Sequence, residues 1–211
     1  MQALGKHTPF IVAMALVVAA SNYLVQFPVQ ASLGGYNLAD LLTWGAFTYP
    51  VAFLVTDLTN RRFGPGPARQ VVIAGFAVAV LLSIWLATPR IAIASGSAFL
   101  VAQLLDVTIF DRLRRASWWK APLVSSIIGS IVDTIIFFSL AFAPAFGLLG
   151  ANDDFAIASA PLLGLAMIDA PRWVSWALGD LGVKLVVALV MLAPYGALLS
   201  LIRPMGDPRA A

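Results

Sequence analysis

The sequence predicts an all-α membrane protein that crosses the bilayer six times as one transmembrane domain over residues 1–211. Three observations predict this fold class. Hydrophobic residues make up 61% of the chain and charged residues only 11%, against about 45–50% and about 25% in soluble domains. The apolar residues form long unbroken runs, whereas the strands of a membrane β-barrel alternate between apolar and polar positions. Most of the basic residues lie in short turns between these runs.

Six apolar runs are long enough to cross a bilayer as helices, which takes about 20 residues each. The predicted spans are residues 9–27, 38–60, 69–88, 91–110, 122–149 and 173–202. The first run follows Lys6 and has a cleaved signal peptide as its alternative, but it continues apolar past Ala20 and five more runs follow. Pro194 is expected to kink the long last span.

The segment between the last two spans is expected to lie at the membrane interface or to re-enter the membrane. Its apolar part, residues 156–168, is interrupted by Pro161 and follows Asp153 and Asp154. A stretch of this length is too short to span a bilayer comfortably. A seventh span is the alternative interpretation.

Charge asymmetry favours six spans and predicts the orientation. With six spans, one side of the membrane would hold most of the basic residues, namely Lys6, Arg61, Arg62, Arg69, Arg112, Arg114, Arg115, Lys120, Arg203 and Arg209. The opposite side would hold only Arg90 and Arg172. Because cytoplasmic loops carry an excess of Lys and Arg, both termini are predicted to be cytoplasmic.

Five ionisable residues fall inside the predicted spans. Each would cost about 2.5–3.5 kcal/mol if left unpaired at a helix centre, so they are expected to face the interior of the bundle. They are Asp57, Asp106, Asp133, Asp180 and Lys184. Because intramembrane acids usually mark substrate or proton sites, these residues are the first candidates for a functional site.

Asp133 is the strongest candidate, because it lies several turns inside the fifth predicted span. It shares a helix face with Ser126 and Ser130. This polar face predicts a substrate or proton site. The alternative is a stripe that holds two helices together, with Gly129 allowing their close approach.

Asp106 lies three residues after Gln103, on the same helix face. It belongs either to the site or to the solvated cytoplasmic end of its span, where Arg112 or Arg114 would pair with it. A short internal repeat, in which residues 102–110 resemble 129–137, aligns Asp106 with the acid of the fifth span. Internal repeats are common in transporters, whose sites lie at the repeat interface.

Asp57 and Asn60 end the second predicted span and are candidates for the same site. Pro50 removes a backbone hydrogen bond earlier in this span and is expected to bend the helix around a site. The alternative for Asp57 is a surface ion pair with Arg61, four residues later, which would contribute little.

Lys184 follows Asp180 by four residues, in the order that favours an ion pair along a helix. It therefore either neutralises Asp180 or pairs with Asp133. Asn22 and Trp44 complete the candidates. Asn22 is a polar residue in the first span, and the Trp44 ring would stack on a flat ligand unless it serves core packing instead.

The sequence contains no recognisable catalytic signature. It has no cysteine, one histidine, His7, no Ser/His/Asp set and no nucleotide-binding loop. We therefore expect no enzymatic activity, no cofactor and no metal. The net charge of +3 follows the pattern of membrane topology, so no nucleic acid partner is expected.

Several short motifs together resemble the queuosine precursor transporter family, which is grouped with vitamin uptake transporters. The residues that carry the resemblance are Thr43, Tyr49-Pro50, Phe53-Leu54, Thr56 to Asn60, Ala68-Arg69, Gln103, Asp106, Ile109-Phe110, Asp133-Thr134, Lys184 and Pro194. They span roughly residues 36 to 200. The chain departs from the family pattern at Ser130, where a glutamine is expected, and at Arg61-Arg62, where an acidic residue is expected.

The resemblance implies a bacterial inner-membrane importer with six helices. Its expected substrates are 7-cyano-7-deazaguanine and 7-aminomethyl-7-deazaguanine, with queuine or another vitamin-like or nucleobase solute as alternatives. The implied fold is like that of the substrate-binding subunits of energy-coupling-factor importers, working without the ATPase module. The resemblance is compatible with either a monomer or a homodimer.

A deazaguanine edge offers two N–H donors and a carbonyl, which a carboxylate and an amide or hydroxyl can bind. We expect Asp133 to contact the amine edge, with Gln103, Asp106 and Ser130 as further polar contacts. Asp57, Asn60 and Lys184 would shape or gate the pocket.

Overall fold

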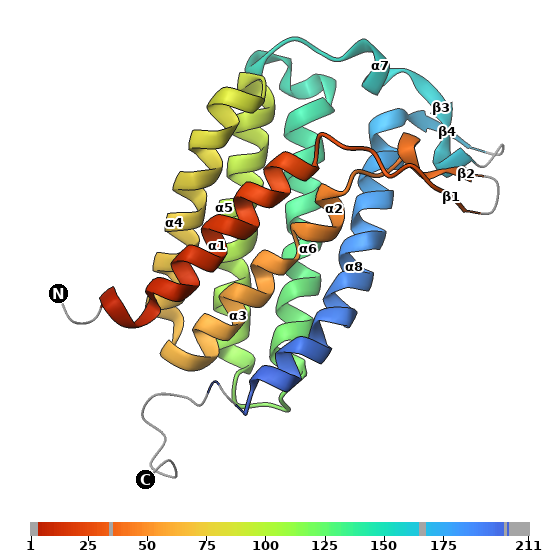
Figure 1. The fold of residues 1–211 in the computed structure, drawn as a ribbon. Coiled ribbons are helices and arrows are strands. Elements are labelled where there is room, and N and C mark those ends of the chain that lie inside the picture. Colours follow the sequence, from red (N-terminus) through yellow and green to blue (C-terminus); the bar gives the residue numbers. More distant parts are fainter. Residues whose placement is uncertain (1–3, 34–35, 165–167, 201, 203–211) are drawn as a thin grey trace, which may run out of the picture.

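The structure is a computed structural model, and it describes residues 4–33, 36–164, 168–200 and 202. The predicted tail arginines Arg203 and Arg209 lie outside the described residues. Most of the chain is helical (Figure 1). The long helices are α1 (Leu4–Leu24), α4 (Pro65–Leu86), α5 (Pro89–Leu113), α6 (Lys120–Phe142) and α8 (Arg172–Leu198).

Shorter elements connect these helices. The short α-helices are α2 (Gly45–Thr48), α3 (Val51–Phe63) and α7 (Asp154–Ile157), and the 3-10 turns are η1 (Leu38–Asp40), η2 (Pro144–Leu149) and η3 (Leu162–Gly164). Two antiparallel hairpins pair β1 (Ser32–Leu33) with β2 (Tyr36–Asn37) and β3 (Ser159–Pro161) with β4 (Asp169–Pro171). The fold is therefore mostly helical, as predicted, with two short hairpins that the sequence did not predict.

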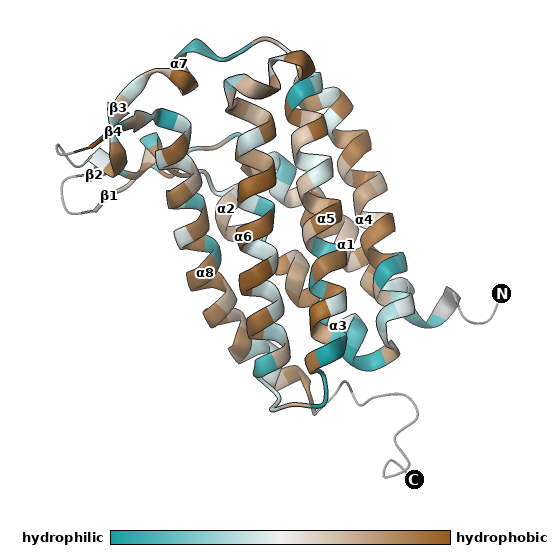
Figure 2. Ribbon diagram, turned by 180° about the vertical axis from the view of Figure 1, so that it is seen from behind, coloured by the Kyte–Doolittle hydropathy of each residue, from teal (hydrophilic) through white to brown (hydrophobic). Residues whose placement is uncertain are grey.

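The outer surfaces of the long helices are apolar, as expected of a bundle in lipid. Five described helices, α1, α4, α5, α6 and α8, are long and apolar enough to cross a membrane. Hydrophobic residues cover their outward faces (Figure 2). Trp85 is 87% exposed, and Leu81, Ile84, Ile135 and Leu189 are also exposed. Exposure of so many large apolar side chains is unfavourable in water, so the chain is a helical membrane protein that crosses the bilayer several times.

The second predicted span differs most from its prediction, because residues 38–60 do not form one continuous helix. Residues 42–44 run alongside residues 27–29, through the hydrogen bonds Val29 N to Leu42 O (3.0 Å) and Trp44 N to Phe27 O (3.0 Å). Helix α2 then begins at Gly45, and Pro50 separates it from α3. Proline lacks the amide that would continue the helix, so the chain bends at the point that Pro50 predicted.

Helix α3 ends in a turn that only glycine adopts easily. Gly64 has φ +89°, in the left-handed region, and Pro65 follows it as the first residue of α4. A glycine after a helix and a proline at the start of the next are the usual pair of signals for such a reversal. The turn fixes where α3 stops, and therefore where Asn60 and Arg61 lie.

The predicted fifth span, 122–149, is longer than the helix that forms. Helix α6 ends at Phe142, before Pro144, and η2 continues to Leu149. Of the segment 156–168, residues 156–164 include the end of α7 and all of β3 and η3. Residues 165–167 lie outside the described residues. This segment lies across one end of the bundle beside the β1–β2 hairpin (Figure 1). The last predicted span, 173–202, corresponds to α8, which continues through Pro194 to Leu198.

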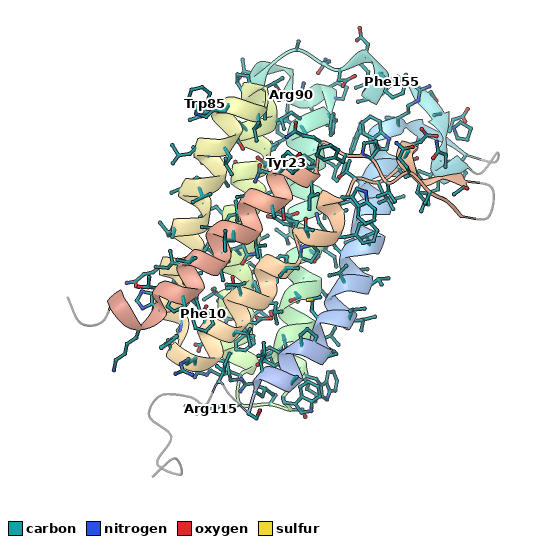
Figure 3. All side chains as sticks on the ribbon, viewed as in Figure 1. Phe10, Tyr23, Trp85, Arg90, Arg115 and Phe155 are labelled. Carbon is teal, nitrogen blue, oxygen red and sulfur yellow. The ribbon has the colours of Figure 1, made fainter. Side chains whose placement is uncertain are left out.

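The two ends of the bundle differ in charge. Helices α3, α5 and α8 end, and α4 and α6 begin, at the same end, which we call the basic end. It carries Arg61, Arg62, Arg69, Arg112, Arg114, Arg115 and Lys120. The other end, the hairpin end, carries Arg90 and Arg172 of the described basic residues. Figure 3 shows Arg115 at the first end, and Arg90 and Phe155 at the second.

A buried arginine ties two helices together at the hairpin end. Arg90, near the start of α5, is 4% exposed. Its guanidinium donates to the backbone oxygens of Leu140 (2.9 Å) and Ala143 (2.7 Å), which come at the end of α6. It also donates to the oxygens of Gly150 (3.2 Å) and Ala151 (3.1 Å). The positive charge thus satisfies carbonyls that the end of α6 leaves free.

Candidate functional site

The interior of the bundle contains a connected group of polar side chains around Lys184, which we call the lysine cluster. It consists of Lys184, Asp133, Asp180, Thr134 and Tyr49. Lys184 Nζ lies 2.7 Å from Asp133 Oδ2 and also forms an ion pair with Asp180. Both alternatives for Lys184 therefore hold at once, since one ammonium serves two carboxylates.

The remaining members fix the positions of the two acids. The Tyr49 hydroxyl donates to Asp133 Oδ1 (3.0 Å), and the Thr134 hydroxyl donates to Asp180 Oδ2 (3.0 Å). The ammonium of Lys184 also lies 5.4 Å from the centre of the Tyr49 ring. Helices α6 and α8 supply four of the side chains, and Tyr49 enters from the bend between α2 and α3. This bend is thus what brings Tyr49 to Asp133.

A second acidic group, the carboxyl pair, lies between α3 and α5. Asp57 and Asp106 are 1% and 0% exposed. Their carboxyl groups lie next to one another, with the Ser125 hydroxyl beside both. Ser125 Oγ donates a long hydrogen bond of 3.4 Å to Asp57 Oδ1. Neither oxygen of Asp106 receives a well-formed hydrogen bond from the described residues.

Two further hydrogen bonds join α3 to α5 beside this pair. Thr56 Oγ1 donates to Gln103 Oε1 (2.6 Å), and Asn60 Nδ2 donates to the backbone oxygen of Val107 (2.9 Å). All four residues are fully buried. Helical spacing explains the pattern, because residues 56 and 60, and 103 and 107, are each one turn apart.

The alternatives that placed Asp57 and Asp106 in surface ion pairs are wrong. Arg61 lies close enough to Asp57 to attract it, but its hydrogen bonds go to the Tyr195 hydroxyl (2.9 Å) and the backbone oxygen of Arg114 (2.7 Å). Arg114 pairs with Asp111 at 3.2 Å instead of with Asp106. The acids point into the bundle because the wide polar face of α3 meets α5 and α6 there.

A narrow crevice runs between α3, α6 and α8. Its lining includes Asp57, Ser126 and Ser130 together with Phe53 and Tyr195. Its volume is about 10 Å³, enough for about one water molecule. Neither Asp133 nor Asp106 lines this crevice. A flat bicyclic ligand would need the three helices to separate.

Several buried polar atoms near these groups have no hydrogen-bond partner among the described residues. They are Asn60 Oδ1, Gln103 Nε2, both carboxyl oxygens of Asp106 and Ser130 Oγ. Buried polar groups without partners are costly, and they commonly await a ligand or water. The set offers one amide donor, one hydroxyl and three acceptor oxygens, which suits a ligand with donors and acceptors on one edge.

Two predicted site residues are not brought to these groups. The Asn22 side chain donates to Val18 O of its own helix (2.9 Å) and is only partly buried. Trp44 is 48% exposed and packs against Phe47 with a ring separation of 5.7 Å. Because the break in the second span leaves Trp44 near the hairpin end, its ring faces outward.

Four side chains in these two groups were not predicted as site residues. Tyr49, Thr56, Ser125 and Thr134 each hydrogen-bond a candidate site residue. Tyr49 precedes Pro50, and Thr134 follows an intramembrane acid, so their positions in the sequence gave a usable signal. Ser125 gave less, because Ser126 beside it appeared to belong to the polar face. Among the described residues, no three acidic or histidine side chains gather closely enough to hold a metal ion.

The chain matches a family model described as "Putative vitamin uptake transporter" over residues 43–88 and 81–198. A protein of Escherichia coli (strain K12) named queuosine precursor transporter is 36% identical over 209 residues, covering 89% of this chain and 83% of that protein. A probable queuosine precursor transporter of Haemophilus influenzae is 35% identical, covering 88% and 83%.

A probable queuosine precursor transporter of Bacillus subtilis (strain 168) is 28% identical over 128 residues, covering 47% of this chain and 56% of that protein. No solved structure matches the chain. The matched residues 43–88 and 81–198 include both the lysine cluster and the carboxyl pair.

Proposed function

Since the chain belongs to the putative vitamin uptake transporter family, we propose that it imports 7-deazaguanine precursors of queuosine across the membrane. The observation that carries the proposal is the 36% identity to a queuosine precursor transporter over 89% of the chain. The expected substrates are 7-cyano-7-deazaguanine and 7-aminomethyl-7-deazaguanine, with queuine as a further substrate.

The lysine cluster supplies the chemistry for the amine edge of such a substrate. Asp133 holds one donor on each oxygen, Tyr49 and Lys184, and each carboxylate oxygen can accept a second. Two adjacent N–H groups of the deazaguanine edge would fill these positions as a charge-assisted pair. The cationic aminomethyl group of 7-aminomethyl-7-deazaguanine would be attracted to the carboxylates of the same lysine cluster.

The partnerless atoms nearby supply the rest of the proposed site. Within the described part of the chain, Gln103 Nε2 has no acceptor and would donate to the substrate carbonyl, and Ser130 Oγ is an unpaired hydroxyl on the wall of the crevice. Asn60 and Thr56 would hold α3 against α5 while Lys184 positions Asp133. Trp44 and Asn22, which lie away from this group, have no role in the proposed site.

The protein would lie in the bacterial cytoplasmic membrane and cross it six times. The second crossing would be made by η1, α2 and α3 together, bent at Pro50. The basic end would face the cytoplasm, because cytoplasmic ends carry the excess of Lys and Arg. The bundle would resemble the substrate-binding subunits of energy-coupling-factor importers. It would act on a small molecule without an ATPase module, cofactor or nucleic acid, as a monomer or homodimer.

The proposal is tested in a bacterial strain that cannot make its own precursor. Given external 7-cyano-7-deazaguanine, cells that express the protein should regain queuosine in their tRNA. Cells with an empty vector, and expressing cells without external precursor, should not. Absence of queuosine in cells whose membranes contain the folded protein would contradict the substrate assignment.

The family description favours a second candidate, uptake of another vitamin-like or nucleobase solute. Direct binding of a panel of purines and vitamins to the purified protein separates the two. The first proposal expects the deazaguanines to bind more tightly than guanine, because guanine carries a ring nitrogen where they carry the 7-substituted carbon. Tightest binding of a vitamin would favour the second.

A further inference from the structure

The two acidic groups of the bundle differ in one respect, which is the presence of a buried cation. Asp133 and Asp180 share the ammonium of Lys184. Asp57 and Asp106 are as deeply buried, yet no ion pair joins either of them to a described basic residue. Two adjacent carboxylates without a cation repel one another in a medium of low polarity.

The surroundings of the carboxyl pair offer little other compensation. On α3, Arg61 lies one turn from Asp57, but its guanidinium is bound to Tyr195 and to a backbone oxygen. On α6, the Ser125 hydroxyl is the nearest donor, at 3.4 Å. From α8, Tyr195 uses its hydroxyl to accept from Arg61. On α1, the buried His7 ring packs against Phe63 at the end of α3.

The carboxyl pair also has hydrogen-bonding capacity that is not used. Both oxygens of the fully buried Asp106 lack a well-formed hydrogen bond in the described part of the chain. Asp57 also lines the crevice between α3, α6 and α8, so the pair can be reached from that space. A crevice that holds about one water molecule admits a proton carrier but not a larger solute.

We propose that Asp57 and Asp106 form a proton-binding site that couples substrate uptake to proton entry. A proton shared by the two carboxyl groups removes their repulsion and supplies the hydrogen-bond donor that Asp106 lacks. The proton enters from outside with the substrate and leaves to the cytoplasm when the crevice opens there. A proton gradient across the membrane would then supply the energy for uptake. This inference rests on the proposed uptake function.

The experiment uses the purified full chain in liposomes that contain a pH-sensitive dye. Labelled 7-cyano-7-deazaguanine is added outside, and the entry of substrate and of protons is measured in the same vesicles. Because the pair shares a single proton, the wild-type protein should carry a proton with each substrate molecule, and an acidic exterior should drive accumulation. The ratio of protons to substrate should fall towards zero in Asp57→Asn and Asp106→Asn.

Asp111→Asn is the matched control. Asp111 lies on α5 close to Asp106 in sequence, but its side chain is 39% exposed and pairs with Arg114, so its variant should keep the wild-type ratio. Substrate entry without proton entry in the wild-type protein overturns the inference, even if neither pair variant folds. A wild-type ratio in both pair variants also overturns it. If no labelled substrate enters vesicles that contain the wild-type protein, even by exchange for unlabelled substrate inside, the proposed uptake function is wrong. The proton inference, which rests on it, is then wrong as well.

Discussion

Lys184 is the residue on which the interior charge balance depends. Its ammonium contacts Asp133 and Asp180, and all three side chains lie within the bundle. The sequence placed Lys184 one turn after Asp180 and left open which acid it would bind. Spacing along one helix can identify Asp180, but only the packing of α6 against α8 brings Asp133 to the same ammonium.

We predict that Lys184→Met strongly destabilises the protein. Removing one partner of a buried ion pair leaves uncompensated charge and costs about 3–5 kcal/mol. Thermal unfolding of the purified protein in detergent measures the effect. Lys120→Met, which changes an exposed lysine at the start of α6, should unfold near the wild-type temperature. Equal unfolding temperatures for the two variants would contradict the role assigned to Lys184.

Tyr49→Phe should weaken substrate binding with little change in packing. The substitution removes only the hydroxyl that donates to Asp133 Oδ1, and a lost hydrogen bond to a charged group costs about 1.5–3 kcal/mol. The apparent affinity for 7-cyano-7-deazaguanine should fall about tenfold or more. Tyr23→Phe is the control, because Tyr23 is 59% exposed on α1. Unchanged affinity in Tyr49→Phe would remove the hydroxyl from the proposed site.

At the scale of elements, the close approach of α3 and α6 depends on Gly129. A Cβ atom at this position would lie 2.7 Å from Phe53 Cε1 and 3.1 Å from Phe53 Cζ. The Phe53 ring is 1% exposed and has little room to move. This contact holds together the two helices that line the crevice with α8.

Gly129→Ala is therefore predicted to destabilise the bundle by about 1–3 kcal/mol, as overpacking of a filled interior does. Gly182→Ala is the matched control on α8, where a Cβ would meet nothing within 4 Å. Because alanine favours helix more than glycine does, Gly182→Ala should be neutral or slightly stabilising in the same unfolding assay. A Gly129→Ala protein as stable as wild type would mean that the helices can separate at no cost.

The long helices were predictable because length and hydrophobicity alone mark them. Helices α4 and α5 begin within about four residues of their predicted spans, at prolines that start a helix well. The second span was not predictable in detail, because residues 42–44 pair with residues 27–29 instead of continuing a helix. Hydropathy does not register such long-range backbone pairing, and it also missed the hairpins.

The candidate site, like the fold, was predictable only in part. Burial of the acids followed from the cost of charge in lipid, and the structure buries Asp57, Asp106 and Asp133. The sequence did not predict that these acids divide between the lysine cluster and the carboxyl pair, because this division depends on which helices are neighbours. The repeat that aligned Asp106 with Asp133 falls on α5 and α6, which share the most extensive interface among the described helices. Asp133 nevertheless pairs with Lys184, whereas Asp106 lies beside Asp57.

At the scale of the whole molecule, the two ends of the bundle should lie on opposite sides of the membrane. The chain has no cysteine, so a single introduced cysteine reports its own accessibility. Leu148→Cys, at a fully exposed position of the hairpin end, should react with a membrane-impermeant maleimide in cells whose outer membrane has been opened. Ser117→Cys, at the basic end, should react only after the inner membrane is broken. The reverse pattern would contradict the orientation.

Asp133 is the proposed substrate contact on which the uptake mechanism depends most. The direct measurement is the queuosine content of tRNA in the precursor-deficient strain, supplied with 7-cyano-7-deazaguanine and expressing Asp133→Asn or Asp111→Asn at equal amounts of folded protein in the membrane. We predict that Asp111→Asn restores queuosine to the wild-type level and that Asp133→Asn leaves it at the level of the empty vector. Wild-type queuosine in cells carrying Asp133→Asn would contradict the account.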